Sequence, residues 1–261
     1  MYSEQIREIV EKLKSAGRLI SNVYSGDIIC GVDRFWNNDV AILLEYNDLG
    51  VNRLYYYAHK LNDINGLLGR LPVGEYVLEY LTKNPKNDFD LLKNMGFVCL
   101  ARMMRMSVRN CSFPFTDAGI RRNYNESIEV CPDVGLAKNI NQVLWDVFDT
   151  RVSHLLNDDG LTIAIKKKEI MIHQDSNGKI DAVLQTVIQP QRFYINQVYN
   201  RADKSVIHSM LQKRLKEYMD AGGKYVYAWV DSNNVASIKF HQKYGLQHDG
   251  MWNMVYLLKR N

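Results

Sequence analysis

The stretch YVYAWVDSNNVASIKFHQKYGL, residues 225–246, decides the fold of this chain of 261 residues. Its first part is aromatic and β-branched, which is typical of a buried strand. Residues 231–234 supply side-chain oxygens that can cap a helix, and Gly245 suits the left-handed position just past a helix end. The stretch therefore predicts a strand followed by a short helix that carries one histidine, His241. Ligands of open α/β sheets bind at the carboxyl ends of strands, so His241 is a candidate site residue.

The residues before this stretch predict the rest of an α/β unit. Residues 135–149 have a helical pattern that continues to about 168, and residues 169–188 form a hairpin pattern with Ser176-Asn177-Gly178 at its turn. A strand is expected over 192–200, and a long amphipathic helix over 203–221. The order is therefore hairpin, strand, long helix, strand, short helix and strand.

The first half of the chain contains elements of the same kinds. A helix is expected over 3–16, and the later elements are expected to be strands at 41–47, 53–59 and 75–81, a helix at 86–95 and a strand at 97–108. Residues 109–127 are polar and have no periodicity, which favours a linker.

Two segments of the chain match without gaps. Residues 74–97 and 223–246 align at a constant offset of 149, with five identities in 24 positions. The identical pairs are Gly74/Gly223, Tyr76/Tyr225, Val77/Val226, Asn84/Asn233 and Gly96/Gly245. This match favours a duplicated strand–helix unit. We therefore interpret the chain as two related α/β domains, joined near residues 109–125.

Composition excludes several classes of protein. The net charge is only +4, and Lys166-Lys167-Lys168 is more typical of a solvated helix face than of a nucleic-acid patch, so no nucleic-acid partner is expected. No apolar run is long enough to span a membrane, and the N-terminus lacks an apolar signal core. Four scattered cysteines (Cys30, Cys99, Cys111, Cys131) suggest reduced thiols in a cytoplasmic protein. No histidine has metal-ligand spacing, so no metal site is expected.

The order of elements over residues 135–258 resembles the GNAT superfamily of N-acetyltransferases. The most specific part is Val230-Asp231-Ser232-Asn233-Asn234 followed by ASIKFHQKYGL, which is similar to the family's fifth strand and fourth helix. The resemblance implies an α/β (α+β) protein of two GNAT-like lobes, each a mixed, mostly antiparallel sheet flanked by helices. It places a degenerate lobe at residues 1–110 and an acyltransferase lobe at residues 125–261.

The family binds acetyl-CoA between its fourth and fifth strands, so the resemblance implies acetyl-CoA as the acyl donor. The pantetheine arm would pair with the backbone of Gln197, Val198 and Tyr199. The pyrophosphate would lie at the start of the next helix, and the residues implied there are Lys204, Ser205, Val206 and Ile207, with Asn234 on the following turn. The substrate-facing candidates are Tyr194 and Asn196.

The phosphate turn departs from the family pattern. The family writes it as Arg/Gln-x-x-Gly-x-Gly/Ala, whereas this chain has Ala202-Asp203-Lys204-Ser205-Val206-Ile207 and neither glycine. The bulk of Ile207 and the charge of Asp203 are expected to hinder phosphate, although Lys204, Ser205 and Arg201 could compensate for that charge. Three explanations stay open: a weakened CoA site, a different donor such as an acyl-carrier-protein thioester, or a lobe without catalysis.

His241 falls where many members of the family place a tyrosine that protonates the departing thiolate. The resemblance therefore implies that His241 is a general acid, and the alternative is a polar surface residue of a short helix. At the matching place in the first lobe stands Leu92, which has no proton to give, and Pro85 matches Asn234. The first lobe is thus expected to be structural.

The expected function is acyl-CoA-dependent transfer, most simply of an acetyl group, to the primary amine of a small molecule or a peptidyl substrate. The alternatives are a non-catalytic GNAT-like binding or regulatory module, and an acyltransferase that uses a carrier-protein donor.

Overall fold

The computed structural model describes residues 4–23, 33–37, 40–46, 49–86, 89–109, 128–130 and 132–261. The chain forms two compact units. The first unit holds Met1–Met103 together with Met251–Asn261, and the second unit holds Met104–Gly250. The predicted division follows chain order, whereas these contacts group the end of the chain with the first unit. Most of the expected linker, and Cys30, Cys111 and Cys131, lie outside the described residues.

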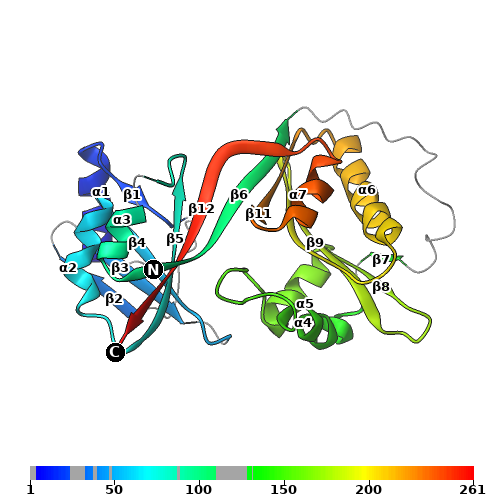
Figure 1. The fold of residues 1–261 in the computed structure, drawn as a ribbon, viewed down its shortest axis with the longest axis horizontal. Coiled ribbons are helices and arrows are strands. Elements are labelled where there is room, and N and C mark those ends of the chain that lie inside the picture. The colour runs from blue at the N-terminus through cyan, green and yellow to red at the C-terminus, as the bar shows by residue number, and fades with distance from the viewer. Residues whose placement is uncertain are drawn as a thin grey trace. The chain divides into compact units, whose positions relative to one another are not determined.

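The first unit is a mixed sheet with helices on both faces (Figure 1). Its strand order is β2-β3-β4-β5-β12-β6, with β1 paired to β4. Neighbouring strands are antiparallel at β2–β3, β3–β4 and β5–β12, and parallel at β4–β5. Its elements are α1 (Glu4–Ser15), β1 (Ile20–Ser21), β2 (Asp33–Trp36), β3 (Ala41–Tyr46), β4 (Asn52–Ala58), η1 (Leu61–Ile64), α2 (Asn65–Leu68), β5 (Gly74–Thr82), α3 (Phe89–Asn94), the start of β6 (Phe97–Arg109) and most of β12 (Gln247–Arg260).

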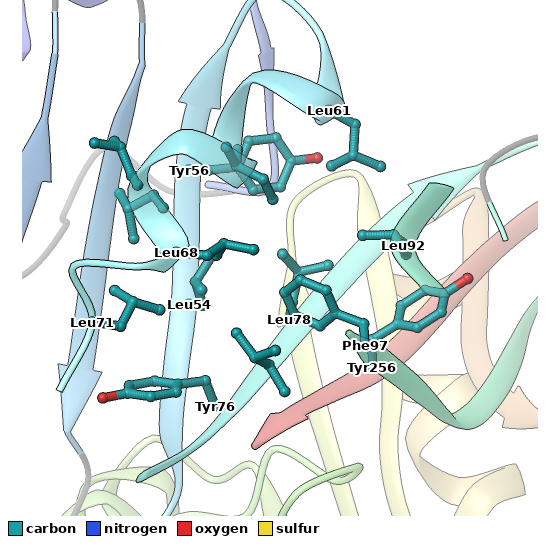
Figure 2. Close-up of a cluster of buried hydrophobic side chains, with 14 of the residues drawn as sticks. Leu54, Tyr56, Leu61, Leu68, Leu71, Tyr76, Leu78, Leu92, Phe97 and Tyr256 are labelled. Carbon is teal, nitrogen blue, oxygen red and sulfur yellow. The ribbon is translucent and has the colours of Figure 1, made fainter. Parts of the chain in front are cut away.

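Successive side chains of a strand point to opposite faces of the sheet, so this unit has a hydrophobic core on each face. One face of the sheet packs under η1, α2 and α3 and includes Leu54, Tyr56 and Leu78. The other face packs under α1, whose Ile6, Ile9 and Leu13 follow helical spacing. Figure 2 shows the first of these cores, with Leu92 of α3 and Tyr256 of β12 among its side chains. Leu92 is fully buried, as a structural role for this position requires.

The second unit repeats this architecture. Its strand order is β6-β11-β10-β9-β8-β7, antiparallel at β7–β8, β8–β9 and β9–β10, and parallel at β10–β11. Its elements are the end of β6, β7 (Ile128–Val130), η3 (Val134–Leu136), α4 (Ala137–Trp145), α5 (Asp158–Lys166), β8 (Ile170–Gln174), β9 (Ile180–Gln189), β10 (Arg192–Asn200), α6 (Lys204–Asp220), β11 (Tyr225–Asp231), α7 (Val235–Gln242) and the start of β12.

The two faces of this second sheet are covered by different helices. Phe193, Ile195 and Val226 join the core that includes the inner side of α6, whereas Ile172 and Val183 pack with α4 and α5 on the opposite face. The expected mixed, mostly antiparallel sheets flanked by helices are therefore confirmed in both units.

Several predicted elements have the expected bounds. The strand over 192–200 and the hairpin turn at Gly178, whose φ is 76°, are confirmed. The helical sequence expected to about residue 168 forms two helices, α4 and α5, which residues 146–157 separate. The three lysines are exposed, but they end α5 rather than cover its side: Lys166 is its last residue and Lys168 has a φ of 61°.

The constant offset of 149 holds in the helices but is wrong in the strands. Leu92 and His241 are both buried, and Gly96 and Gly245 both have positive φ, so offset 149 is kept there. In the strands, however, Tyr76 faces the core beneath α3, whereas the core beneath α7 contains Val226. The parallel pairs Asn52–Tyr76 to Leu54–Leu78 match Phe193–Val226 to Ile195–Ala228, which relates β5 to β11 at offset 150. A shift of one residue turns every side chain to the other face, so the strand identities relate positions that are not equivalent.

Candidate functional site

The central feature of the second unit is a pair of parallel strands that separate. β10 and β11 are paired only from Phe193–Val226 to Ile195–Ala228. Both strands continue, β10 to Asn200 and β11 to Asp231, while β9 stays paired to β10 as far as Asn200. Beyond Ile195, the backbone groups of β10 that face β11 therefore have no partner strand among the described residues. We call this region the β10–β11 split, bounded by residues 196–200 and 229–231.

The first unit has the same split, but a side chain of its own closes it. β4 and β5 are paired only from Asn52–Tyr76 to Leu54–Leu78. Just beyond, the Asn22 amide nitrogen donates to the carbonyls of Leu54 (2.9 Å) and Glu79 (3.0 Å), and its oxygen accepts from the Tyr56 N–H (2.8 Å). Asn22 is only 2% exposed. Beyond Ile195, no described side chain bridges β10 and β11 in this way.

A β-bulge marks the start of the split in the second unit. The register between β9 and β10 shifts between Ile195 and Gln197, which makes Asn196 the extra residue. The three residues implied in pantetheine binding, Gln197, Val198 and Tyr199, lie directly after this bulge, on the strand edge that β11 has left. Gln197 and Tyr199 are buried, so it is their backbone groups that are placed to pair with a ligand.

The turn after β10 is closed at its helix end by a carboxylate. Asp203 is the N-cap of α6, and its Oδ1 accepts from the Ser205 N–H at 2.8 Å and from the Ser205 hydroxyl at 2.5 Å. Lys204 is exposed. Val206 and Ile207 are buried in the core beneath α6, so the expected obstruction by the bulk of Ile207 is wrong, because this side chain points inward. The charge of Asp203 is what opposes an anion here.

On the other side of the split, α7 follows β11 and carries His241. The Asn234 side-chain oxygen caps this helix by accepting from the Ser237 N–H at 2.9 Å. His241 is 3% exposed, so the alternative reading of a surface histidine is wrong. Its Nδ1 lies 2.8 Å from the Ser237 carbonyl oxygen, and its Nε2 is buried without a hydrogen-bond partner among the described residues.

These contacts set the protonation of His241. A carbonyl can only accept, so Nδ1 carries the ring proton and Nε2 presents a lone pair. Burial lowers the pKa of His241 below its ordinary value, and the Ser237 carbonyl offsets this only in part. The imidazole is therefore neutral near pH 7, and a polar atom that is buried without a partner suits contact with a ligand.

A pocket of about 370 Å³ lies beside α6 and the end of α7, lined by Ser205, His208, Gln212, Lys243 and Tyr244. The Nδ1 of His208 is 2.7 Å from the Tyr244 hydroxyl, and burial and the charge of Lys243 lower the pKa of His208. Sequence reasoning missed this pair, because 36 residues separate its members and neither belongs to a motif.

Tyr194, predicted to face substrate, lies on the sheet face opposite the α6 core. Its ring stacks on Tyr227 with centroids 4.8 Å apart, and Tyr227 stacks on Tyr225 at 5.5 Å. Arg109 lies over the ring of Tyr225 at 4.9 Å. This half-exposed aromatic row borders the paired part of β10 and β11.

The described residues contain no cluster of three or more His, Cys, Asp or Glu side chains that could hold a metal ion. Among the helices in the described part of the chain, none has the length and apolar character of a membrane span.

Comparison with solved structures identifies the class to which this fold belongs. A GCN5-related N-acetyltransferase from Sphaerobacter thermophilus matches with a TM-score of 0.58 at 12% identity, covering 85% of this chain and 78% of that chain. A tandem GNAT protein from the clavulanic acid biosynthesis pathway matches with a TM-score of 0.51 at 10% identity, covering 93% and 83%. A GNAT-family acetyltransferase from Novosphingobium aromaticivorans matches with a TM-score of 0.50 at 11% identity, covering 76% and 80%.

The chain thus has the fold of the GNAT N-acetyltransferases, present twice as in the tandem protein. At these identities the likeness concerns the fold alone. No family model matches the sequence, and no curated protein matches it.

The residues present fit one part of acetyl-CoA and not another. The split offers backbone groups to the amides of a pantetheine arm, and the Nε2 of His241 is a polar atom without a protein partner. The start of α6 does not fit a pyrophosphate, because the Asp203 carboxylate places a negative charge there and already binds the Ser205 N–H, one of the free donors of that helix end. No chemical step proposed below depends on a pyrophosphate contact.

Proposed function

We propose that the second unit is an N-acyltransferase that moves an acyl group from a thioester to a primary amine. The observation that supports it most is the contrast between the two splits: Asn22 closes the first, and no described side chain closes the second. Acetyl-CoA is the simplest donor, and the acceptor is the amine of a small molecule or of a peptide.

The donor arm extends β10 on its open edge. Amide groups of the arm take the places of backbone groups that β11 supplies in the paired part of the sheet, beside Gln197, Val198 and Tyr199. The arm carries amide groups that can donate to and accept from the backbone of β10. Without the arm, those backbone groups would lack these hydrogen bonds. Such pairing would hold the thioester end of the arm in a fixed position relative to β10.

His241 moves one proton in the reaction. The amine nitrogen attacks the thioester carbon, and the new C–N bond leaves a surplus proton on nitrogen. The Nε2 lone pair of His241 accepts this proton, the C–S bond breaks, and the departing thiolate takes the proton from Nε2. The ring ends neutral, as it began, so a lowered pKa suits this relay better than it suits a resting general acid.

The test measures binding and turnover on the full chain. With S-acetylpantetheine or acetyl-CoA at millimolar concentration, amide hydrogen exchange is expected to slow at residues 196–200 and to stay unchanged at residues 55–58, the matched positions of the closed split. Release of free thiol in the presence of amines then reports transfer. Protection without thiol release for any amine would favour a non-catalytic binding module, and no protection with either thioester would refute the proposal.

A further inference from the structure

We propose that Asp203 determines donor specificity in the second unit. Its carboxylate occupies the start of α6, where a pyrophosphate would otherwise bind. The unit therefore takes an acyl-pantetheine thioester whose recognition does not rest on a pyrophosphate. This inference rests on the proposed function and names its donor class. The shared chemistry is the acyl-pantetheine arm, which is part of the small molecule acyl-CoA and is also attached to carrier proteins.

The geometry leaves little of the helix end for another anion. A helix N-terminus attracts anions through its free N–H groups and its dipole. Here Oδ1 of Asp203 accepts from the N–H of Ser205 at 2.8 Å and from its hydroxyl at 2.5 Å. The carboxylate therefore uses both nearby donors of Ser205, and the Val206 N–H donates to the Asp203 carbonyl at 3.0 Å.

A pyrophosphate at this end would have to displace the carboxylate and then lie beside it. Displacement leaves the carboxylate without its two donors, and two like charges at short range repel each other. The turn also carries Arg201 and Lys204, both exposed. With Asp203 these give a local charge of +1, two cations less one carboxylate, which suits a single phosphodiester better than the several phosphate charges of CoA.

The absence of glycine is a separate matter. Val206 and Ile207 are buried beneath α6 and do not project into the turn, so removing their bulk would not restore a phosphate site. The charge of Asp203 is the single feature whose removal tests the inference.

The experiment compares three acetyl thioesters by calorimetry on the full chain: acetyl-CoA, acetyl-4′-phosphopantetheine and acetylpantetheine. For the native chain we expect acetyl-CoA to bind within about fivefold of acetylpantetheine, because the common arm supplies the binding. In Asp203→Ser, which keeps a neutral cap, acetyl-CoA should bind roughly tenfold tighter while acetylpantetheine is unchanged.

Asp133→Ser is the matched control, because Asp133 caps η3 in the same way by accepting from the Gly135 N–H at 3.0 Å. It should change none of the three affinities. The inference is overturned if the native chain binds acetyl-CoA about a hundredfold tighter than acetylpantetheine and Asp203→Ser adds nothing. That result would leave the proposed function intact, whereas failure of all three thioesters to bind native and variant chains would refute both. Tighter binding of the phosphopantetheine form alone would support the inference and identify a carrier-borne arm as the donor.

Discussion

The proton of His241 is fixed by a single contact. Because Nδ1 donates to the Ser237 carbonyl, the reactive position is Nε2, and burial keeps the ring neutral near pH 7. Position in the sequence suggested a general acid, and that role stays a prediction. A resting general acid would need the protonated, charged imidazole, whereas a proton relay starts from the neutral imidazole. The contact with Ser237 and the burial of the ring favour the neutral form.

The pH dependence of turnover separates these two roles. If His241 relays a proton from its neutral form, kcat/KM falls as pH drops through the lowered pKa, below about 6.5, and the limb at acidic pH is lost in His241→Ala and His241→Gln. Both variants should lower kcat by roughly 10- to 1,000-fold. A resting general acid would show the reverse, with rates that rise toward low pH. Leu92→Ala, at the matching place in the first unit, should change stability and leave the profile alone.

Asn22 is expected to contribute to the stability of the first unit through the same bonds that close its split. Asn22→Ala removes the three buried hydrogen bonds that this side chain makes to the Leu54 and Glu79 carbonyls and to the Tyr56 N–H, so the free energy of unfolding should drop by about 2–4 kcal/mol. Asn52→Ala is the control, because its side chain makes one exposed bond, to the Glu75 carbonyl, and should cost less than about 1 kcal/mol. Equal losses for the two variants in urea unfolding would contradict this account.

At the scale of elements, the break between α6 and β11 depends on the contact of a glycine with a ring. A Cβ at Gly223 would lie 2.3 Å from Cζ of Tyr218, closer than two non-bonded carbon atoms can approach. Tyr218 is held in place, because its hydroxyl donates to the Tyr225 carbonyl at 3.1 Å and its ring is buried. Gly222, with a φ of 86°, lies just past the end of α6, and the packing against Tyr218 shows why the second glycine is required.

Gly223→Ala should therefore destabilise the chain by roughly 1–3 kcal/mol, since the Tyr218 ring must shift in a packed core. Thermal unfolding followed by circular dichroism measures the effect. Gly66→Ala serves as the control, because a Cβ there meets nothing within 4 Å, and it should be neutral or slightly stabilising. Matching melting temperatures for the two variants would argue against the ring contact.

At the scale of the whole molecule, β6 and β12 each belong to both units. β12 pairs with β5 from Trp252–Thr82 to Arg260–Gly74, and it lies between β5 and β6 in the sheet of the first unit. In the second unit β6 lies next to β11, and Arg105 over Trp229 with Arg109 over Tyr225 shows that these strands run antiparallel. Each sheet is thus completed by a strand that chain order alone would assign elsewhere.

Removal of residues 251–261 should therefore unfold the first unit and spare the second. The deletion takes Met254, Tyr256 and Leu258 out of the first core and exposes an edge of β5. Amide exchange is expected to become fast in β3 and β4 and to stay slow in β8 and β9. Tyr256→Ala gives the milder form, with a loss of about 3–5 kcal/mol confined to the same strands. Full protection of β3 and β4 after the deletion would show that β12 is dispensable.

The sequence by itself determined the local elements around the site. Periodicity, caps and glycines predicted β10, α6, β11 and α7 nearly to the residue, because each depends on neighbours within a few positions. The resemblance drawn from residues 230–246 gave the fold, and it named His241 and residues 197–199 as candidates. Sequence identity could not reveal that the strand match is displaced by one residue. Which side chains of a strand enter the core depends on the register of the strand in its sheet.

The tertiary structure decided everything that depends on partners distant in the chain. It showed that Asn22 closes one split and that Ile207 points inward. It also grouped β12 with the first unit. The physical reason is common to these three findings: hydrogen bonds and burial join residues that lie far apart along the chain or choose the direction of a side chain, and a linear pattern records neither distance in space nor orientation.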